Sequence, residues 1–119
     1  MAKINRLAFG SIVIEGRKHR TDVVILVDGT VKRLRGGFLM FGSHEIKEPE
    51  LEELSPGQPD VIIVGTGTDG AAHIATEAHA WAKANNVTVL VQPSHDAIVR
   101  LNELVEQKKK VAALIHITC

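Results

Sequence analysis

The sequence lacks the features that mark secreted and membrane proteins. Its single cysteine, Cys119, cannot form a disulfide within the chain, as is usual in a reducing compartment. The longest uninterrupted apolar runs, residues 23–27 and 111–115, are far shorter than the ~20 residues that cross a bilayer. The first residues also lack the continuous apolar core of a secretory signal. We therefore expect a cytoplasmic protein that does not enter a membrane.

Aromatic residues are scarce as well, with three Phe, one Trp and no Tyr. Proteins that bind single-stranded nucleic acid usually stack bases on aromatic side chains set among basic ones. The main basic cluster has no aromatic residue interleaved with it, and comprises Arg17, Lys18, Arg20, Lys32, Arg33 and Arg35. We interpret it as a solvated basic face and disfavour a nucleic-acid partner, with nucleic-acid binding through these basic residues as a third alternative. Arg33 and Arg35 would share one face of a strand, however, and could bind a small anion.

Length and composition are those of one globular domain. The chain has 119 residues, 45% of them hydrophobic and 24% charged, which suffices for a single hydrophobic core. Its charges are unevenly distributed: residues 1–43 carry eight basic and three acidic side chains, and residues 44–60 carry one basic and six acidic. We expect the two regions to complement one another within the fold, with recruitment of a charged partner as the alternative.

The first forty residues predict β structure. Residues 7–14 and 22–27 are rich in β-branched side chains, Asp28-Gly29 is a two-residue hairpin signal, and residues 30–35 resume as a strand. These strands predict a small antiparallel meander, which Gly36-Gly37 then interrupts.

The apolar segment Phe38-Leu39-Met40-Phe41 follows this break and has no evident place in the pattern. Four bulky apolar side chains must be covered by the core or by a partner. Phe38 and Phe41 are therefore candidate partner-binding residues.

The rest of the chain alternates between helix and strand. A short helix is predicted over residues 48–54, because Pro49 and several carboxylates stand in its first turn. The elements predicted after it are a strand over 61–64, a helix over 71–84, a strand over 87–91, a helix over 94–109 and a strand over 111–117. This βαβαβ unit requires a parallel sheet with right-handed crossovers.

The sequence Gly65-Thr66-Gly67-Thr68-Asp69-Gly70 has the G-x-G-x-x-G spacing between a predicted strand and a predicted helix. Glycines let the backbone approach a phosphate, and a helix N-terminus offers N–H groups to it. The next strand, however, ends in Gln92-Pro93 without the acidic residue that would bind a ribose, and the chain contains only one such half. A tight turn that starts a helix is favoured over a dinucleotide site, and no cofactor is predicted.

Several polar residues follow the strands of this unit. Ser94 is a good N-cap for the second crossover helix, which leaves His95 as the neighbour with uncommitted chemistry. At the end of the last strand, alternation places His116 and Thr118 on one face and Cys119 on the other. Parallel strands would bring these residues to one edge, where open α/β sheets usually bind ligands. The candidate ligand-binding residues are Gly65, Thr66, Gly67, Thr68, Gly70, Ser94, His95, His116, Thr118, Cys119 and Arg33.

Neither catalysis by the cysteine nor metal binding is predicted. A nucleophilic thiol needs an activating base, and strand alternation separates Cys119 from His116. The six histidines do not show the spacing of a metal site; His73 and His79, for example, would lie on different faces of a helix.

An ordered set of segments runs along the chain: Asp60 before the strand into Gly65-Thr66-Gly67, Ala97 and Asn102 in the second helix, Val111-Ala112-Ala113, and the terminal His116-x-Thr118-Cys119. Together they resemble a family of single-domain proteins without an assigned activity. Its mammalian members include an adipogenesis-associated cytoplasmic protein and an assembly factor of mitochondrial respiratory complex I. The resemblance implies a three-layer α/β fold with a mixed sheet and helices, and no catalytic residue or cofactor to carry over.

These observations predict a non-catalytic binding or assembly domain that contacts a protein partner or a second copy through Phe38 and Phe41. The alternative is a small enzyme or sensor that binds an anionic, phosphorylated or carboxylated ligand. That ligand would lie at the carboxyl edge of the parallel strands, with Arg33 as its possible charge partner.

Overall fold

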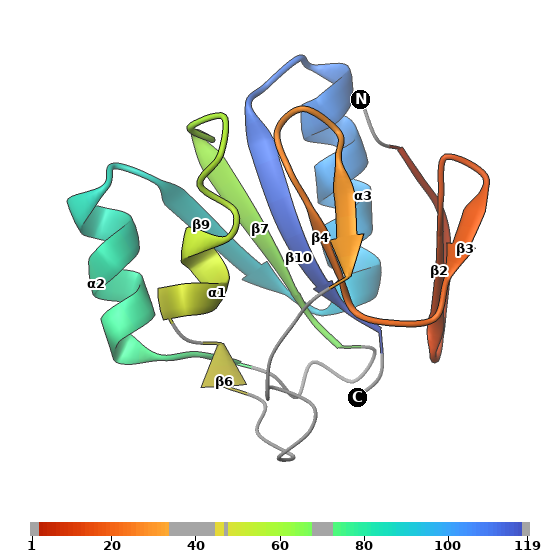
Figure 1. Cartoon of the computed structure of the whole chain (residues 1–119), viewed down its shortest axis with the longest axis horizontal. Helices are drawn as coiled ribbons and strands as arrows, with labels where there is room; N and C mark the ends of the chain where they lie inside the picture. The colour runs from red at the N-terminus through yellow and green to blue at the C-terminus, as the bar shows by residue number, and fades with distance from the viewer. Residues whose placement is uncertain (1–2, 34–44, 47, 68–72, 118–119) are drawn as a thin grey trace.

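The computed structural model describes residues 3–33, 45–46, 48–67 and 73–117. Within them the strands are β1 Ile4–Ala8, β2 Ser11–Ile14, β3 Arg17–His19, β4 Val23–Ile25, β5 Val31–Arg33, β6 Glu45–Ile46, β7 Val61–Thr66, β8 His73–Ile74, β9 Thr88–Gln92 and β10 Val111–His116. The helices are α1 Glu48–Glu52, α2 Thr76–Ala84 and α3 Ser94–Glu106. These elements confirm the predicted mixed α/β fold, with an antiparallel meander ahead of a βαβαβ unit (Figure 1).

The larger of the sheets in the described residues has five strands in the order β5-β4-β10-β7-β9. The last strand, β10, is therefore its centre: it pairs in parallel with β7 and antiparallel with β4. All six residues of β10 are buried, because elements cover the sheet on both faces. Burial on both faces accounts for the uninterrupted apolar run that the sequence shows over residues 111–115.

Alternate residues of the sheet contribute to two separate hydrophobic cores. Ile63 and Ile115 pack with Leu101 of α3 and with the apolar face of β1 and β2. Ile62 and Leu114 point the other way and pack with α1 and α2. The central sheet thus separates α3 and the three-stranded sheet on one side from α1 and α2 on the other (Figure 1).

The N-terminal strands differ from the prediction in their grouping. The strand predicted over 7–14 is divided at Gly10, which has a φ of +82° and whose N–H donates to the Ile117 carbonyl (2.8 Å). A second turn at Glu15-Gly16 leads into β3, which was not predicted. The order β1-β2-β3 forms the meander, whereas β4 and β5 join the large sheet.

The hairpin between β4 and β5 is confirmed, but its loop is one residue longer than predicted. Leu26 N–H donates to the Thr30 carbonyl (2.9 Å), so Val27, Asp28 and Gly29 form the loop, with Gly29 at a φ of +91°. The Thr30 hydroxyl and the Thr30 backbone N–H both donate hydrogen bonds to the Asp28 carboxylate. These bonds lower the pKa of Asp28, and the bond from the hydroxyl has the larger effect.

The first crossover helix begins later than predicted. Residues 73–74 form β8, which pairs in parallel with β6, and α2 starts only at Thr76. Ala75 N–H donates to the Ile46 carbonyl (2.8 Å), so the backbone is held in an extended pairing before the helix begins. The stretches predicted as helix over 71–72 and as strand over 34–35 lie outside the described residues.

A substitution at Gly57 would show how tightly the segment after α1 packs on the β4–β5 hairpin. Its φ is +85°, and a Cβ there would lie 2.9 Å from Val27 Cβ; Gly16 has a similar φ of +78° with nothing within 4 Å. The left-handed conformation costs an L-residue about 1–2 kcal/mol. We expect Gly16→Ala to lower the free energy of unfolding by about that amount and Gly57→Ala to lower it further. Urea denaturation measures the free energy of unfolding of both variants. Equal decreases would show that Val27 can move away from the added methyl group without a loss of stability.

Candidate functional site

The register of the parallel strands brings several predicted residues to one edge of the sheet. His116 pairs with Thr66, and Gly65 pairs with both Ile115 and Gln92. Because β7, β9 and β10 run in the same direction, their carboxyl ends lie together, and we call this end of the sheet the carboxyl edge. Of the predicted site residues, Gly65, Thr66, Gly67, Ser94 and His116 meet there.

Ser94 connects the ends of two strands. Its buried hydroxyl donates to the His116 carbonyl (2.6 Å) and accepts from the Gly67 N–H (2.9 Å). Its backbone N–H donates to the Gly67 carbonyl (2.9 Å). The prediction that Ser94 is the N-cap of α3 was wrong, because Pro93 occupies the cap position without a side-chain cap and the serine hydroxyl is used across the sheet.

The glycines before α2 make room for α3. A Cβ at Gly65 would lie 2.8 Å from Ser94 Oγ and 3.2 Å from Ile115 Cδ1, so a larger residue would displace the start of α3. Gly67 has a φ of +103°, in the region that favours glycine. The Thr66 hydroxyl donates to the Gln92 carbonyl (3.1 Å). The Thr66 hydroxyl and the Gly67 N–H therefore form hydrogen bonds within the fold. In a phosphate-binding loop, such groups would point toward the ligand.

A buried pair of side chains, His116 and Asp22, also lies at the carboxyl edge. His116 Nδ1 is 2.7 Å from Asp22 Oδ2, and the side chains are 0% and 1% exposed. The second oxygen, Asp22 Oδ1, accepts from the Ile117 N–H (2.8 Å). A carboxylate at this nitrogen favours the imidazole form that carries its proton there and holds the ring in one orientation. Asp22 was not among the predicted site residues, although it is a charged residue that opens an apolar strand.

The remaining predicted residues are more dispersed. Arg33 pairs with Val23, which pairs with Ile115, so Arg33 stands in the same cross-strand row as Gly65 but two strands from β10. Arg33 and His95 are both exposed. The other candidates lie outside the described residues: Arg35, Phe38, Phe41, Thr68, Gly70, Thr118 and Cys119.

Phe9 was not predicted as a site residue, although it lies next to the carboxyl edge. It is 67% exposed at the turn between β1 and β2, and the neighbouring Gly10 N–H binds the Ile117 carbonyl just beyond β10. The described core contains no phenylalanine, only smaller aliphatic side chains beside the partly buried Trp81. A large aromatic side chain is therefore exposed to water, whereas the described core is built mainly from aliphatic residues.

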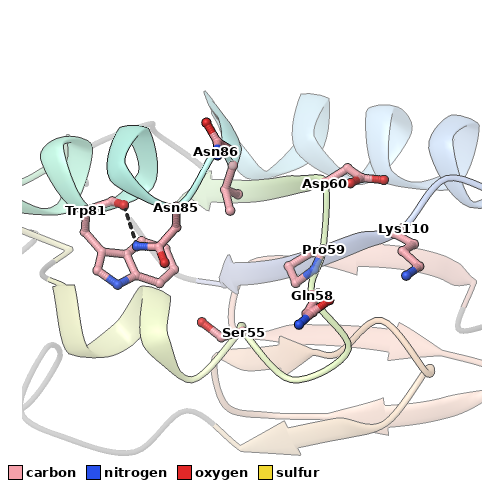
Figure 2. A pocket seen from close by; sticks show the side chains of 9 residues that line it. Ser55, Gln58, Pro59, Asp60, Trp81, Asn85, Asn86 and Lys110 are labelled. Carbon is pink, nitrogen blue, oxygen red and sulfur yellow. Dashed lines mark hydrogen bonds between the residues drawn. The ribbon is translucent and has the colours of Figure 1, made fainter.

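A groove lies at the opposite, amino end of the parallel strands (Figure 2). It has a volume of about 420 Å³ and runs between the α1–β7 and α2–β9 connections; its lining includes Ser55, Gln58, Asp60, Trp81, Asn86 and Lys110. The Asn85 amide donates to the Trp81 carbonyl (2.8 Å) at one end. The groove contains none of the candidate ligand-binding or partner-binding residues, because the ligand-binding candidates mostly follow the strands whereas the lining of the groove precedes them.

Two features are absent from the residues that the structure describes. None of the helices in this part of the chain is both long and apolar enough to cross a membrane. In the same residues, no group of three or more histidine, cysteine or carboxylate side chains is arranged to hold a metal ion.

Fold and site together define an α/β domain in which Ser94, His116 and Asp22 at the carboxyl edge are hydrogen-bonded within the fold. Residues 4–116 match the model of a family described as a protein of unknown function, DUF498/DUF598, and the chain belongs to that family. A search of curated proteins found no match.

Solved structures agree with this assignment. The chain is 34% identical to MT938, with 100% of both chains covered and a TM-score of 0.83. It is 30% identical to the conserved hypothetical protein PH1505 from Pyrococcus horikoshii OT3, over 98% of this chain and 99% of that one, with a TM-score of 0.85. A Bordetella pertussis protein described as a Mth938-like domain is 14% identical over 98% and 85% of the two chains and shares the fold, with a TM-score of 0.79.

The hydroxyl of Ser94 should contribute measurably to stability. In Ser94→Ala, the buried His116 carbonyl and Gly67 N–H both lose a partner, and each unsatisfied group costs about 1–3 kcal/mol. We expect the free energy of unfolding in urea to fall by about 2–4 kcal/mol. The control is Ser55→Ala, which removes the hydroxyl of a half-buried serine at the amino end of the sheet. This variant should change the free energy of unfolding by less than about 0.5 kcal/mol. A Ser94 variant as stable as the control would contradict the bridging role.

Proposed function

We infer that this chain is a non-catalytic binding domain that contacts another protein at the carboxyl edge of its sheet. The proposal is carried by a contrast at that edge. The Ser94 hydroxyl and the His116–Asp22 pair there are buried and hydrogen-bonded within the fold, whereas Phe9 beside them is two-thirds exposed. These buried hydrogen bonds hold the carboxyl edge in a fixed shape. An exposed aromatic side chain beside it is the kind of residue that anchors protein interfaces.

The bonding of Ser94 argues against a role for this residue as a catalytic nucleophile. A serine nucleophile gives its proton to an imidazole, which a carboxylate orients. Here the Ser94 hydroxyl donates its hydrogen bond to the backbone carbonyl of His116 and not to the imidazole ring, whose Nδ1 contacts Asp22. The three residue types of a hydrolytic triad are therefore present at one edge without the connection that would activate the serine.

The family resemblance of the sequence supports the same reading. One mammalian member of the family it resembles is an assembly factor, a role that implies protein contacts. We extend the proposed surface from Phe9 to Phe38 and Phe41, whose apolar segment needs a partner or the core to cover it. We also propose a cytoplasmic location for the protein and its partner.

Serine substitutions at the phenylalanines test the proposal. The tagged chain would be incubated with an extract of its source cells, cross-linked and analysed by quantitative mass spectrometry. We expect Phe9→Ser, and the double variant Phe38→Ser with Phe41→Ser, to lose at least tenfold of the captured partner, because a buried aromatic anchor is worth about 2 kcal/mol or more, or about 30-fold in affinity.

The matched control is Val99→Ser, which changes an apolar side chain that is 60% exposed on α3, away from this edge. It should capture the same partner as the unchanged chain. Thermal unfolding of every variant verifies that the fold is intact. If the phenylalanine variants capture the partner as well as Val99→Ser does, the carboxyl edge is not the binding surface.

A second candidate function is binding of an anionic ligand at the same edge. It is favoured by the position of Arg33, whose side chain is exposed on the face of the sheet that α3 covers, in one row with Gly65. His95 is exposed in the first turn of α3, where backbone N–H groups and the helix dipole favour negative charge.

A thermal-shift panel of nucleotides, phosphorylated metabolites and carboxylates tests this candidate. A ligand that binds the folded chain raises its melting temperature by mass action. We expect Arg33→Gln to abolish the rise and Lys32→Gln to keep it, because Lys32 carries the same charge on the other face of β5. An unresponsive panel, or equal effects of the two substitutions, would dispose of the candidate.

A further inference from the structure

The edge strands of the sheets differ in how they are protected. An edge strand exposes unpaired backbone N–H and C=O groups, and charged side chains are a common defence against pairing with another chain. The edge strand β3 consists of Arg17, Lys18 and His19, and the edge strand β5 carries Lys32 and Arg33. Much of the basic cluster noted in the sequence therefore lies on two sheet edges, where it disfavours strand addition.

The strand β9 forms the other edge of the large sheet and has no such protection. Its sequence, Thr-Val-Leu-Val-Gln, contains no charged residue and no proline. Val91 is 40% exposed, and Val89 and Leu90 are only partly buried. A neutral edge rich in β-branched residues is the kind that accepts another strand.

The direction of each backbone group on β9 follows from its pairing with β7. Thr88 N–H donates to the Asp60 carbonyl (3.1 Å), and Thr88 is in register with Val61. In a parallel ladder alternate residues bond to the neighbouring strand, so Thr88, Leu90 and Gln92 face β7. The N–H and C=O groups of Val89 and Val91 therefore point away from the sheet, and they have no partner among the described residues.

We propose that β9 pairs antiparallel with β9 of a second copy of this chain, about a two-fold axis at Leu90. Val89 of each copy then lies opposite Val91 of the other, and every outward N–H meets a carbonyl. The two five-stranded sheets join into one continuous sheet. The exposed Val91 packs beside Val89 of the other copy, and the two Leu90 side chains meet on the opposite face.

The residues that flank β9 select this register over its neighbours. An axis at Val89 would place Val91 opposite Val87, whose N–H already donates to the Ala82 carbonyl (3.0 Å). An axis at Val91 would place Val89 opposite Pro93, which has no N–H. The axis at Leu90 alone satisfies all the outward groups.

The strand favours a second copy as its occupant because it is complementary to itself. A closed two-fold pair needs one surface that matches its own rotated image, and β9 meets that condition in both its hydrogen-bonding groups and its lack of charge. A partner of another sequence would need no such symmetry. The contact is short, so we expect an association that depends on protein concentration.

Sedimentation velocity and light scattering from micromolar to millimolar concentration test the proposal. The mass should rise from 12.9 kDa toward twice that value as the concentration increases. Val91→Pro removes an outward N–H without touching the pairing with β7, and proline is tolerated at such edge positions. Val91→Lys adds the charge that β3 and β5 already carry. Both variants should remain at 12.9 kDa over the whole range.

Val99→Lys introduces the same charge at an exposed valine on α3 and should associate like the unchanged chain. Hydrogen exchange gives an independent measurement: the Val89 and Val91 amides should exchange more slowly as the concentration rises. If Val91→Pro does not fold, Val91→Lys and the exchange data still decide the question. An unchanged chain that stays monomeric throughout, or a dimer that survives both Val91 substitutions, overturns the proposal.

The phenylalanine variants at the carboxyl edge separate this inference from the proposed function. Phe9→Ser should form the β9 dimer as the unchanged chain does, because Phe9 lies at the β1–β2 turn. Dimerisation lost in Phe9→Ser but kept in Val91→Lys would place the self-contact at the carboxyl edge and exclude β9.

Discussion

The buried hydroxyl of Ser94 joins the ends of two central strands and positions helix α3. This one oxygen accepts a hydrogen bond from the backbone after β7 and donates one to the carbonyl at the end of β10. Because Ser94 is also the first residue of α3, the same contact places the helix against the sheet. The absence of a side chain at Gly65 provides the space for it, so a glycine and a serine 29 positions apart act as one unit.

Much of the fold was predictable because its helices and strands alternate with clear periodicity. The strands at 61–66, 88–92 and 111–116 and the helix from Ser94 were all anticipated to within a few residues. The errors occur where backbone hydrogen bonds override local preference. Gly10 divides an apolar run because its N–H binds Ile117, more than a hundred residues away, and Ala75 is held extended by Ile46. Such distant partners leave no periodic signal in the sequence.

The location of the candidate site could be predicted, but its bonding could not. Parallel strands require their carboxyl ends to lie together, so Gly65, Ser94 and His116 were expected at one edge. Ser94 also fits the pattern of an N-cap, and local rules favoured that local role over a contact with His116. Asp22 was missed because its partner, His116, is 94 positions away and depends on β4 pairing with β10. The order of the strands decides that pairing, and composition does not encode it.

The central position of β10 also constrains how the domain assembles. The strand that joins β4 to β7 comes from residues 111–116, so the two halves of the large sheet have no shared neighbour until this segment has left the ribosome. Until then β4 and β7 expose the edges that β10 later covers, and the sheet exposes apolar faces that are buried in the finished domain. Pairings so distant in sequence close slowly, and open intermediates of this kind are prone to aggregate. Until residues 111–116 are available, the domain is therefore open to the kind of association that chaperones prevent.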